Sequence, residues 1–207
     1  MSLGSVNKPM PTSNPYLFEP IRTLGTLLFL LAMAIVLSAC GNGQSDNPVG
    51  SLEVRVKDHR DAIDDFKELI LTIGGLRISP DASLKSTDPG WIELIPKVDR
   101  FDLTQYKDGE SLLIYQGQPA PQQFEAIDLE ISQTKGILAQ TEAPAKVENH
   151  VRPIRLQFTT EPGRTVVVLL DLEVLDLSDH PGRGYDLRVR GYELFANGEL
   201  LEKVPPG

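Results

Sequence analysis

The chain has 207 residues, a formal net charge of −9 at neutral pH and one cysteine. An acidic balance of this size argues against nucleic acid or anionic lipid headgroups as the main partner. A single cysteine excludes a disulfide within the chain. We therefore expect a fold stabilised by packing alone, in a chain that is long enough to bury one substantial core.

The first feature in chain order is an uncharged apolar run over residues 27–37, which leads into Leu37-Ser38-Ala39-Cys40. The length of the run fits the hydrophobic region of a secretory signal. The four residues at its end resemble the lipobox of bacterial lipoproteins. This resemblance implies that residues 1–39 are a lipoprotein signal peptide and that Cys40 becomes the lipidated (for example, palmitoylated) first residue of the mature chain. Residues 40–50 have the composition of a flexible tether.

An alternative interpretation of the same segment is a permanent membrane anchor. Residues 23–39 carry no charge, and their number lies at the lower end of what can span a bilayer as a helix. Both interpretations predict a membrane-anchored protein whose residues 51–207 lie outside the cytoplasm, at the periplasmic face of the cell envelope or at the cell surface.

The rest of the chain shows the two-residue periodicity of β-strands and no sustained helical periodicity. Strands are predicted over residues 51–57, 69–73, 91–94, 111–116, 125–131, 154–158, 165–175 and 185–195. Residues 76–78 are expected to continue the second strand beyond a bulge at Gly74-Gly75. Residues 132–150 are predicted as a hairpin or a mobile loop, and residues 196–207 as a C-terminal tail with a turn at Asn197-Gly198.

The most apolar of these segments, residues 165–175, predicts a central strand. Its even-numbered residues from Val166 to Val174 are all apolar, and Asp171 and Glu173 are expected to emerge on the opposite face at one end. Short strands separated by turns, around one core-spanning strand, favour an all-β fold: an antiparallel β-sandwich of about seven to eight strands over residues 51–195.

Four stretches of this pattern resemble a bacterial lipoprotein family known only as domain-of-unknown-function family 4382. They are residues 50–58, 90–94, 101–103 and 124–129. The chain departs from the family at Pro121, where members tend to carry glycine, and this puts the local turn geometry in question. The resemblance implies a sandwich related to transthyretin-like or carboxypeptidase-regulatory-like domains. It implies no activity, because none defines the family.

A search of the sequence for catalytic residues yields no candidate. His59, His150 and His180 all fall in predicted loops, and no serine has the Gly-x-Ser-x-Gly setting of a hydrolase nucleophile. The sequence also lacks the His-Glu-x-x-His pattern of zinc hydrolases. We therefore predict a protein that is not an enzyme and requires no cofactor.

Two weaker candidate binding sites remain. Asp58, Asp61, Asp64 and Asp65 supply the hard oxygen ligands that Ca²⁺ prefers, although their spacing is not that of a known calcium loop. Trp91 is a candidate platform on which a sugar ring could stack, and packing in the core is the alternative. The sequence thus predicts a non-catalytic binding or assembly module whose partners are the membrane, through its lipid, and an envelope protein or glycan. A carbohydrate- or calcium-binding accessory domain beside envelope enzymes is the alternative.

Overall fold

A computed structural model describes residues 50–205, which form an all-β fold of two six-stranded sheets. In the first sheet the order is β12-β11-β10-β1-β5, and β8 also pairs with β11; in the second it is β3-β2-β6-β7, with β4 on β2 and β9 on β6. The strands are β1 (Ser51–Asp58), β2 (Phe66–Ser79), β3 (Ile92–Leu94), β4 (Arg100–Asp102), β5 (Leu112–Gly117), β6 (Gln123–Leu138), β7 (Pro144–Ala145), β8 (Val147–Asn149), β9 (Ile154–Thr159), β10 (Thr165–Asp176), β11 (Tyr185–Ala196) and β12 (Glu199–Val204).

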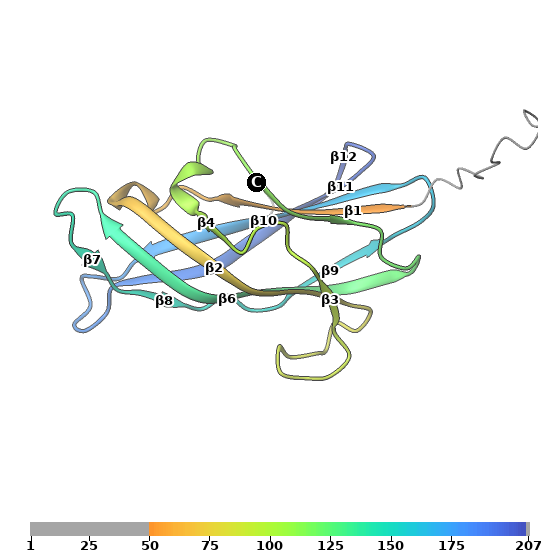
Figure 1. The fold of residues 1–207 in the computed structure, drawn as a ribbon, viewed down its shortest axis with the longest axis horizontal. Helices are drawn as coiled ribbons and strands as arrows, with labels where there is room; N and C mark the ends of the chain where they lie inside the picture. Colours follow the sequence, from red (N-terminus) through yellow and green to blue (C-terminus); the bar gives the residue numbers. More distant parts are fainter. Residues whose placement is uncertain (1–49, 206–207) are drawn as a thin grey trace, which may run out of the picture. The chain divides into compact units, whose positions relative to one another are not determined.

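The two sheets share one hydrophobic core, as in a β-sandwich-like fold. In Figure 1, β2 and β6 cross in front of β10 and β11. The predicted inward residues of β1 and of β10, such as Val54 and Leu170, are completely buried between the layers. This confirms the inward faces that the sequence pattern predicts for the two strands.

The helical content of the described residues is confined to two single turns, η1 (Ile63–Asp65) and η2 (Leu103–Gln105). None of the helices between residues 50 and 205 has the length and hydropathy that crossing a bilayer requires. The signal segment 1–39 lies outside the described residues.

Two features of the strand pairing differ from the predicted antiparallel sandwich. The central strand β10 runs parallel to β1, and β8 runs parallel to β11, so the first sheet is mixed. The prediction was wrong because the periodicity of a sequence fixes which residues face inward but not the direction of the neighbouring strand. The strand number is also larger than predicted, because β4, β7 and β8 are too short to show a period of two.

Two further segments form strands. Residues 132–138, the start of the segment predicted as a hairpin or a mobile loop, continue β6; this strand pairs with β2 along nearly its whole length and folds back antiparallel onto β7, as in a hairpin. Residues 199–204 form the edge strand β12 after the Asn197-Gly198 turn. All six residues of β12 are exposed, so this strand has no buried face whose apolar pattern could reveal it.

A bulge between β10 and β11 determines which residues of β11 face the core. The register shifts after Asp171, which pairs with Gly191, while Leu172 pairs with Val189. The shift lets Leu187 and, beyond the bulge, both Tyr192 and Leu194 reach the core. At Gly191 a Cβ atom would lie 1.6 Å from the carbonyl oxygen of Val204, so only glycine allows the C-terminal strand to lie this close.

Candidate functional site

A hollow whose charged side chains all have the same sign lies between residues 82–87 and the start of β9, and we call it the loop pocket. Its volume is about 560 Å³, within the range of roughly 300–1,000 Å³ that is typical of small-ligand sites. Its lining includes the apolar residues Leu84, Pro153 and Ile154 and the hydroxyl-bearing residues Ser83, Ser86 and Thr87. The pocket thus combines apolar side chains with hydrogen-bonding groups.

Short-range hydrogen bonds fold the loop that forms one wall of this pocket. The Asp81 carboxylate accepts a hydrogen bond from the backbone N–H of Ser83 at 2.8 Å, and the Asp88 carboxylate accepts one from that of Lys85 at 2.9 Å. Bonds from the Ser83 side chain and backbone hold the pKa of Asp81 below its usual value. Arg155 of β9 donates from Nε to the carbonyl of Ala82 at 3.1 Å and so ties the loop to the sheet.

All the charged side chains that line the loop pocket are basic: Lys85, Arg152 and Arg155. None of these three forms an ion pair with another of the described residues. The chain as a whole is acidic, with a net charge of −9, so it does not attract an anion from a distance. Any attraction of an anion to this pocket must therefore come from these three side chains.

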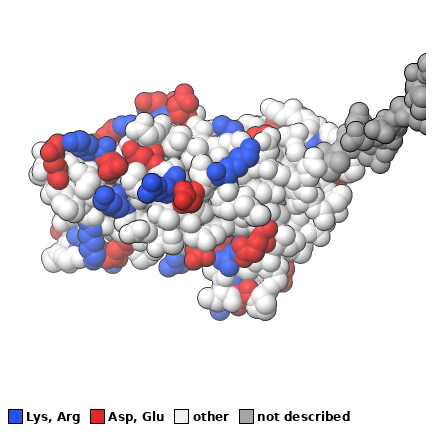
Figure 2. Space-filling model, viewed as in Figure 1, with Lys and Arg blue, Asp and Glu red and all other residues white. Residues whose placement is uncertain are grey.

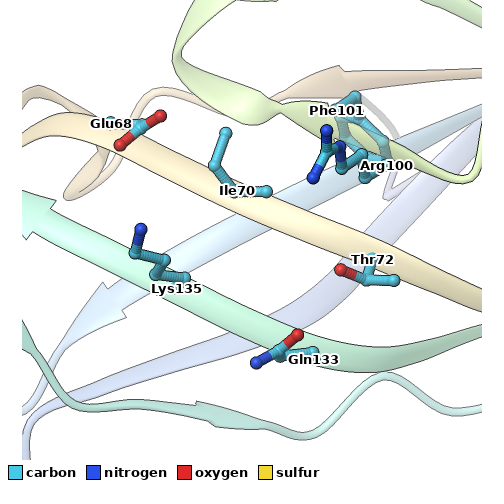
Figure 3. A pocket seen from close by; sticks show the side chains of 7 residues that line it. All are labelled: Glu68, Ile70, Thr72, Arg100, Phe101, Gln133 and Lys135. Carbon is cyan, nitrogen blue, oxygen red and sulfur yellow. The ribbon is translucent and has the colours of Figure 1, made fainter.

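A second hollow, of about 500 Å³, lies on the outer face of the same sheet, and we call it the groove. Its side chains come from three neighbouring strands, β4, β2 and β6, and Figure 3 shows Lys135 and Arg100 on opposite sides of Ile70. The register explains this row, because Thr72 pairs with both Arg100 and Gln133. Glu68 also lines the groove, so its charges are mixed. Figure 2 shows the same interspersed distribution of basic and acidic side chains over the viewed face.

A cluster of titratable groups, Asp58, His59 and Asp171, lies at the end of β1. Asp58 faces the core, 5% exposed, and one of its carboxylate oxygens has no hydrogen-bond partner. Burial raises the pKa of Asp58 to about 6, opposed by a bond from the backbone N–H of Arg60 and reinforced by the nearby Asp171 carboxylate. His59 Nδ1 lies 2.8 Å from the second oxygen of Asp171. We find no nucleophile in this cluster, so the geometry favours a charge network rather than hydrolytic chemistry.

The comparison with family models identifies the family of this chain. A family model described as a domain of unknown function (DUF4382) matches residues 49–186, well over half of the chain. The chain belongs to the DUF4382 family. All four stretches that carry the resemblance seen in the sequence lie inside the matched range of this DUF4382 domain. Comparison with curated proteins and with solved structures gave no match.

The four aspartates proposed as calcium ligands have separate partners in the DUF4382 domain. Asp58 is buried, and Asp64 is exposed and binds Lys107 at 2.7 Å. Asp65 accepts a hydrogen bond from the Tyr185 hydroxyl at 3.2 Å. Asp61 lies beside Glu173 and helps to raise the pKa of that carboxyl, of which burial is the main cause. None of these four carboxylates belongs to a described group of three ligand atoms within 4.8 Å of one another, and calcium binding by them stays a prediction.

Asp171 and Glu173 were expected to be exposed, and this was wrong. They are 8% and 3% exposed, because residues 59–62 extend along β10 and cover its outer face. The backbone N–H groups of His59 and Ala62 donate to the carbonyls of Leu172 and Val174. Arg188 of β11 then donates to the buried Glu173 carboxylate. Sequence alone could not show that a polar loop continues the sheet.

Trp91, the candidate stacking platform, is engaged within the DUF4382 domain. Its indole N–H donates to the carbonyl of Lys85 at 2.9 Å, and the guanidinium of Arg77 lies 5.6 Å from the ring centroid. One face of the ring is therefore used in a cation–π contact. Trp91 thus supports the loop-pocket wall through its bond to Lys85, and sugar stacking on the ring stays a prediction.

The remaining predicted site residues, Leu37, Ser38, Ala39 and Cys40, lie outside the described residues. The loop pocket itself was not found in the sequence. The signal available was the pair Arg152 and Arg155 beside an apolar turn, but nothing in the sequence places residues 82–87 next to them.

Proposed function

We propose that this protein is a non-catalytic binding domain held at the extracytoplasmic membrane surface by a lipid on Cys40, and that its loop pocket binds an anionic glycan of the cell envelope. The observation that carries the proposal is the set of three basic side chains in the loop pocket with no acidic partner among the described residues. The lipid anchor rests on the lipobox-like Leu37-Ser38-Ala39-Cys40. A relation to transthyretin-like domains belongs to the proposal and rests on the family resemblance.

The lining chemistry favours a glycan that carries carboxylate or phosphate groups. Guanidinium groups form bidentate hydrogen bonds with both kinds of anion. The hydroxyl-bearing residues Ser86 and Thr87 suit the hydroxyl-rich edges of a sugar, and the apolar residues Pro153 and Ile154 suit its apolar face. A neutral glycan would leave the basic groups unpaired, so the proposal commits to an acidic one.

Removing two basic groups of the loop pocket is expected to abolish most binding. In the variant Lys85→Ala/Arg152→Ala the affinity for an oligouronate or an oligo(glycerol phosphate) should fall at least about tenfold, because each charge-assisted hydrogen bond contributes about 1.5–3 kcal/mol. Arg155 is kept, because it holds the loop to β9. Isothermal titration calorimetry of the full-length protein with each oligosaccharide, and with a neutral oligoglucan as reference, measures the effect.

The matched control is Arg100→Ala/Lys135→Ala, which removes the same charge from the groove. The affinity of this variant should stay within about twofold of the wild-type value, because salt screens charges that do not contact the ligand. An equal loss in both double variants would mean that net charge alone decides, and would contradict the proposal. So would the absence of wild-type binding to every anionic oligosaccharide tested.

The lipid anchor has its own test. Protein purified from membranes should have a mass that begins at Cys40 and includes acyl chains, and Cys40→Ala should lack both the acyl mass and the cleavage. An unacylated full-length mass from the wild type would contradict lipidation and would identify residues 23–39 as a permanent anchor. Intact-mass spectrometry distinguishes the two.

A further inference from the structure

A cluster of metal-ligating side chains lies away from the loop pocket, where β8 meets β11. It consists of Glu148, His150 and Asp186, and one ligand atom from each lies within 4.8 Å of the others. His150 Nε2 is 3.5 Å from Glu148 Oε2 and 3.7 Å from Asp186 Oδ1. The imidazole nitrogen therefore faces two carboxylate oxygens at once.

The strand pairing explains why the three side chains meet. Glu148 and His150 are two residues apart and project to the same side, while Asp186 pairs with Glu148 in the parallel β8–β11 register. The backbone N–H of His150 donates to the carbonyl of Leu187 at 2.8 Å. On the other side, the Asn149 amide donates to the carbonyl of Ile131 at 2.6 Å. The ligands therefore stand on backbone that is fixed from both sides.

The arrangement of Glu148 favours its use as a metal ligand. Lys146 binds one carboxylate oxygen, Oε1, at 2.5 Å, which leaves Oε2 facing His150. Lys146 thus occupies the outer-shell position that commonly orients a ligating carboxylate.

The separations are close to those of a tetrahedral metal site. Zinc binds imidazole nitrogen and carboxylate oxygen at about 2.0–2.2 Å, which places neighbouring ligands about 3.3–3.6 Å apart. The two separations that involve His150, 3.5 and 3.7 Å, require only a small contraction, and the two carboxylate oxygens lie within 4.8 Å of each other. Calcium, in contrast, prefers six to eight oxygen ligands and has no need of an imidazole.

We propose that Glu148, His150 and Asp186 bind a divalent metal ion of the zinc class, with water in the open coordination position. The ion joins β8 to β11, two strands whose contact within the described residues is a short parallel pairing. It would hold together chain segments that lie far apart in the sequence, as structural metal sites do. The site is independent of the proposed glycan binding.

The test uses full-length protein that has been stripped of metal with a chelator and titrated with ZnCl₂. The wild type should bind one Zn²⁺ per chain and melt at a higher temperature when zinc is present, because a ligand that binds only the folded state stabilises it. Millimolar CaCl₂ should neither bind in its place nor displace it. Bound Co²⁺ should give the intense visible absorption of a tetrahedral site, which a structural role of these residues alone would not produce.

His150→Ala should weaken zinc binding at least about tenfold, because one of three ligands is lost. His180→Ala is the matched control: His180 is an exposed histidine paired with Asp179 at 2.6 Å, and it has no third ligand among the described residues. That variant should bind zinc as the wild type does. Equal melting temperatures of the three metal-free proteins would show that folding is intact. Zinc binding that survives in His150→Ala, or that is absent from the wild type, would overturn the proposal.

Discussion

The variant Asp58→Asn is expected to be more stable than the wild type by about 2–3 kcal/mol at pH 7.5 and to show little gain at pH 4. Burial raises the pKa of Asp58 to about 6, and the ordinary value is 3.8. Each unit of difference corresponds to about 1.4 kcal/mol. Asparagine resembles the protonated acid in shape and keeps an oxygen that can accept the hydrogen bond from the N–H of Arg60.

The sign follows from proton linkage. Because the folded-state pKa of Asp58 lies above the unfolded-state value, the folded protein binds more protons between about pH 4 and pH 6, and wild-type stability falls as the pH rises through this window. Above about pH 6 the buried carboxylate is charged and the full cost is present. Asparagine avoids that cost, so the difference between variant and wild type should grow across the same window.

Urea unfolding of both proteins at a series of pH values between 4 and 8 measures this difference. Asp64→Asn is the matched control, because Asp64 is exposed and its ion pair with Lys107 lowers its pKa. That variant should show no gain at pH 7.5. A difference between Asp58→Asn and wild type that stays constant with pH would show that the charge of Asp58 is not the cause.

The second large effect, a loss of stability, is expected when Arg77 is replaced. Arg77→Met should lower the free energy of unfolding by about 3–5 kcal/mol, because the Asp128 carboxylate would be left charged and unpaired inside the protein. The Asp128 side chain is 3% exposed and pairs with Arg77, which lies opposite it in the β2–β6 register. The same guanidinium contacts the ring of Trp91, so the variant also loosens the wall of the loop pocket.

A double-mutant cycle separates the buried charge from lost packing. Arg77→Met/Asp128→Asn should recover a large part of the loss, since neither partner is then an isolated charge. Lys67→Met, which removes an ion pair with Glu142 in which both side chains are mostly exposed, should cost about 1 kcal/mol or less. If Arg77→Met lowered the free energy of unfolding no more than Lys67→Met does, the buried Arg77–Asp128 pair would not stabilise the fold.

Local sequence patterns were sufficient wherever a strand buries one face. β1 alternates strictly, and the even-numbered residues of β10 from Val166 to Val174 are all apolar, so the inward residues of both strands follow from the period of two. The bulge expected at Gly74-Gly75 is present as a register shift in β2. In contrast, β12 is exposed and residues 132–135 of β6 are polar, so hydrogen bonding to a neighbour rather than burial selects these strands.

For the candidate sites, in contrast, local sequence patterns were not sufficient. Nothing in the sequence distinguishes His150 from His180, because both stand in polar surroundings. What distinguishes His150 is Asp186, which is remote in sequence and is brought beside it by the parallel pairing of β8 with β11. The loop pocket likewise joins residues 82–87 to Arg152 and Arg155 across the second sheet.

The sequence by itself determined the all-β class, the membership of the DUF4382 family and the inward faces of the long strands, because these depend on neighbours along the chain. The tertiary structure alone decided the strand directions, the burial of Asp171 and Glu173, and the meeting of the basic and metal-ligating side chains. Those features arise from contacts between segments distant in sequence, and no local pattern encodes which segments will become neighbours.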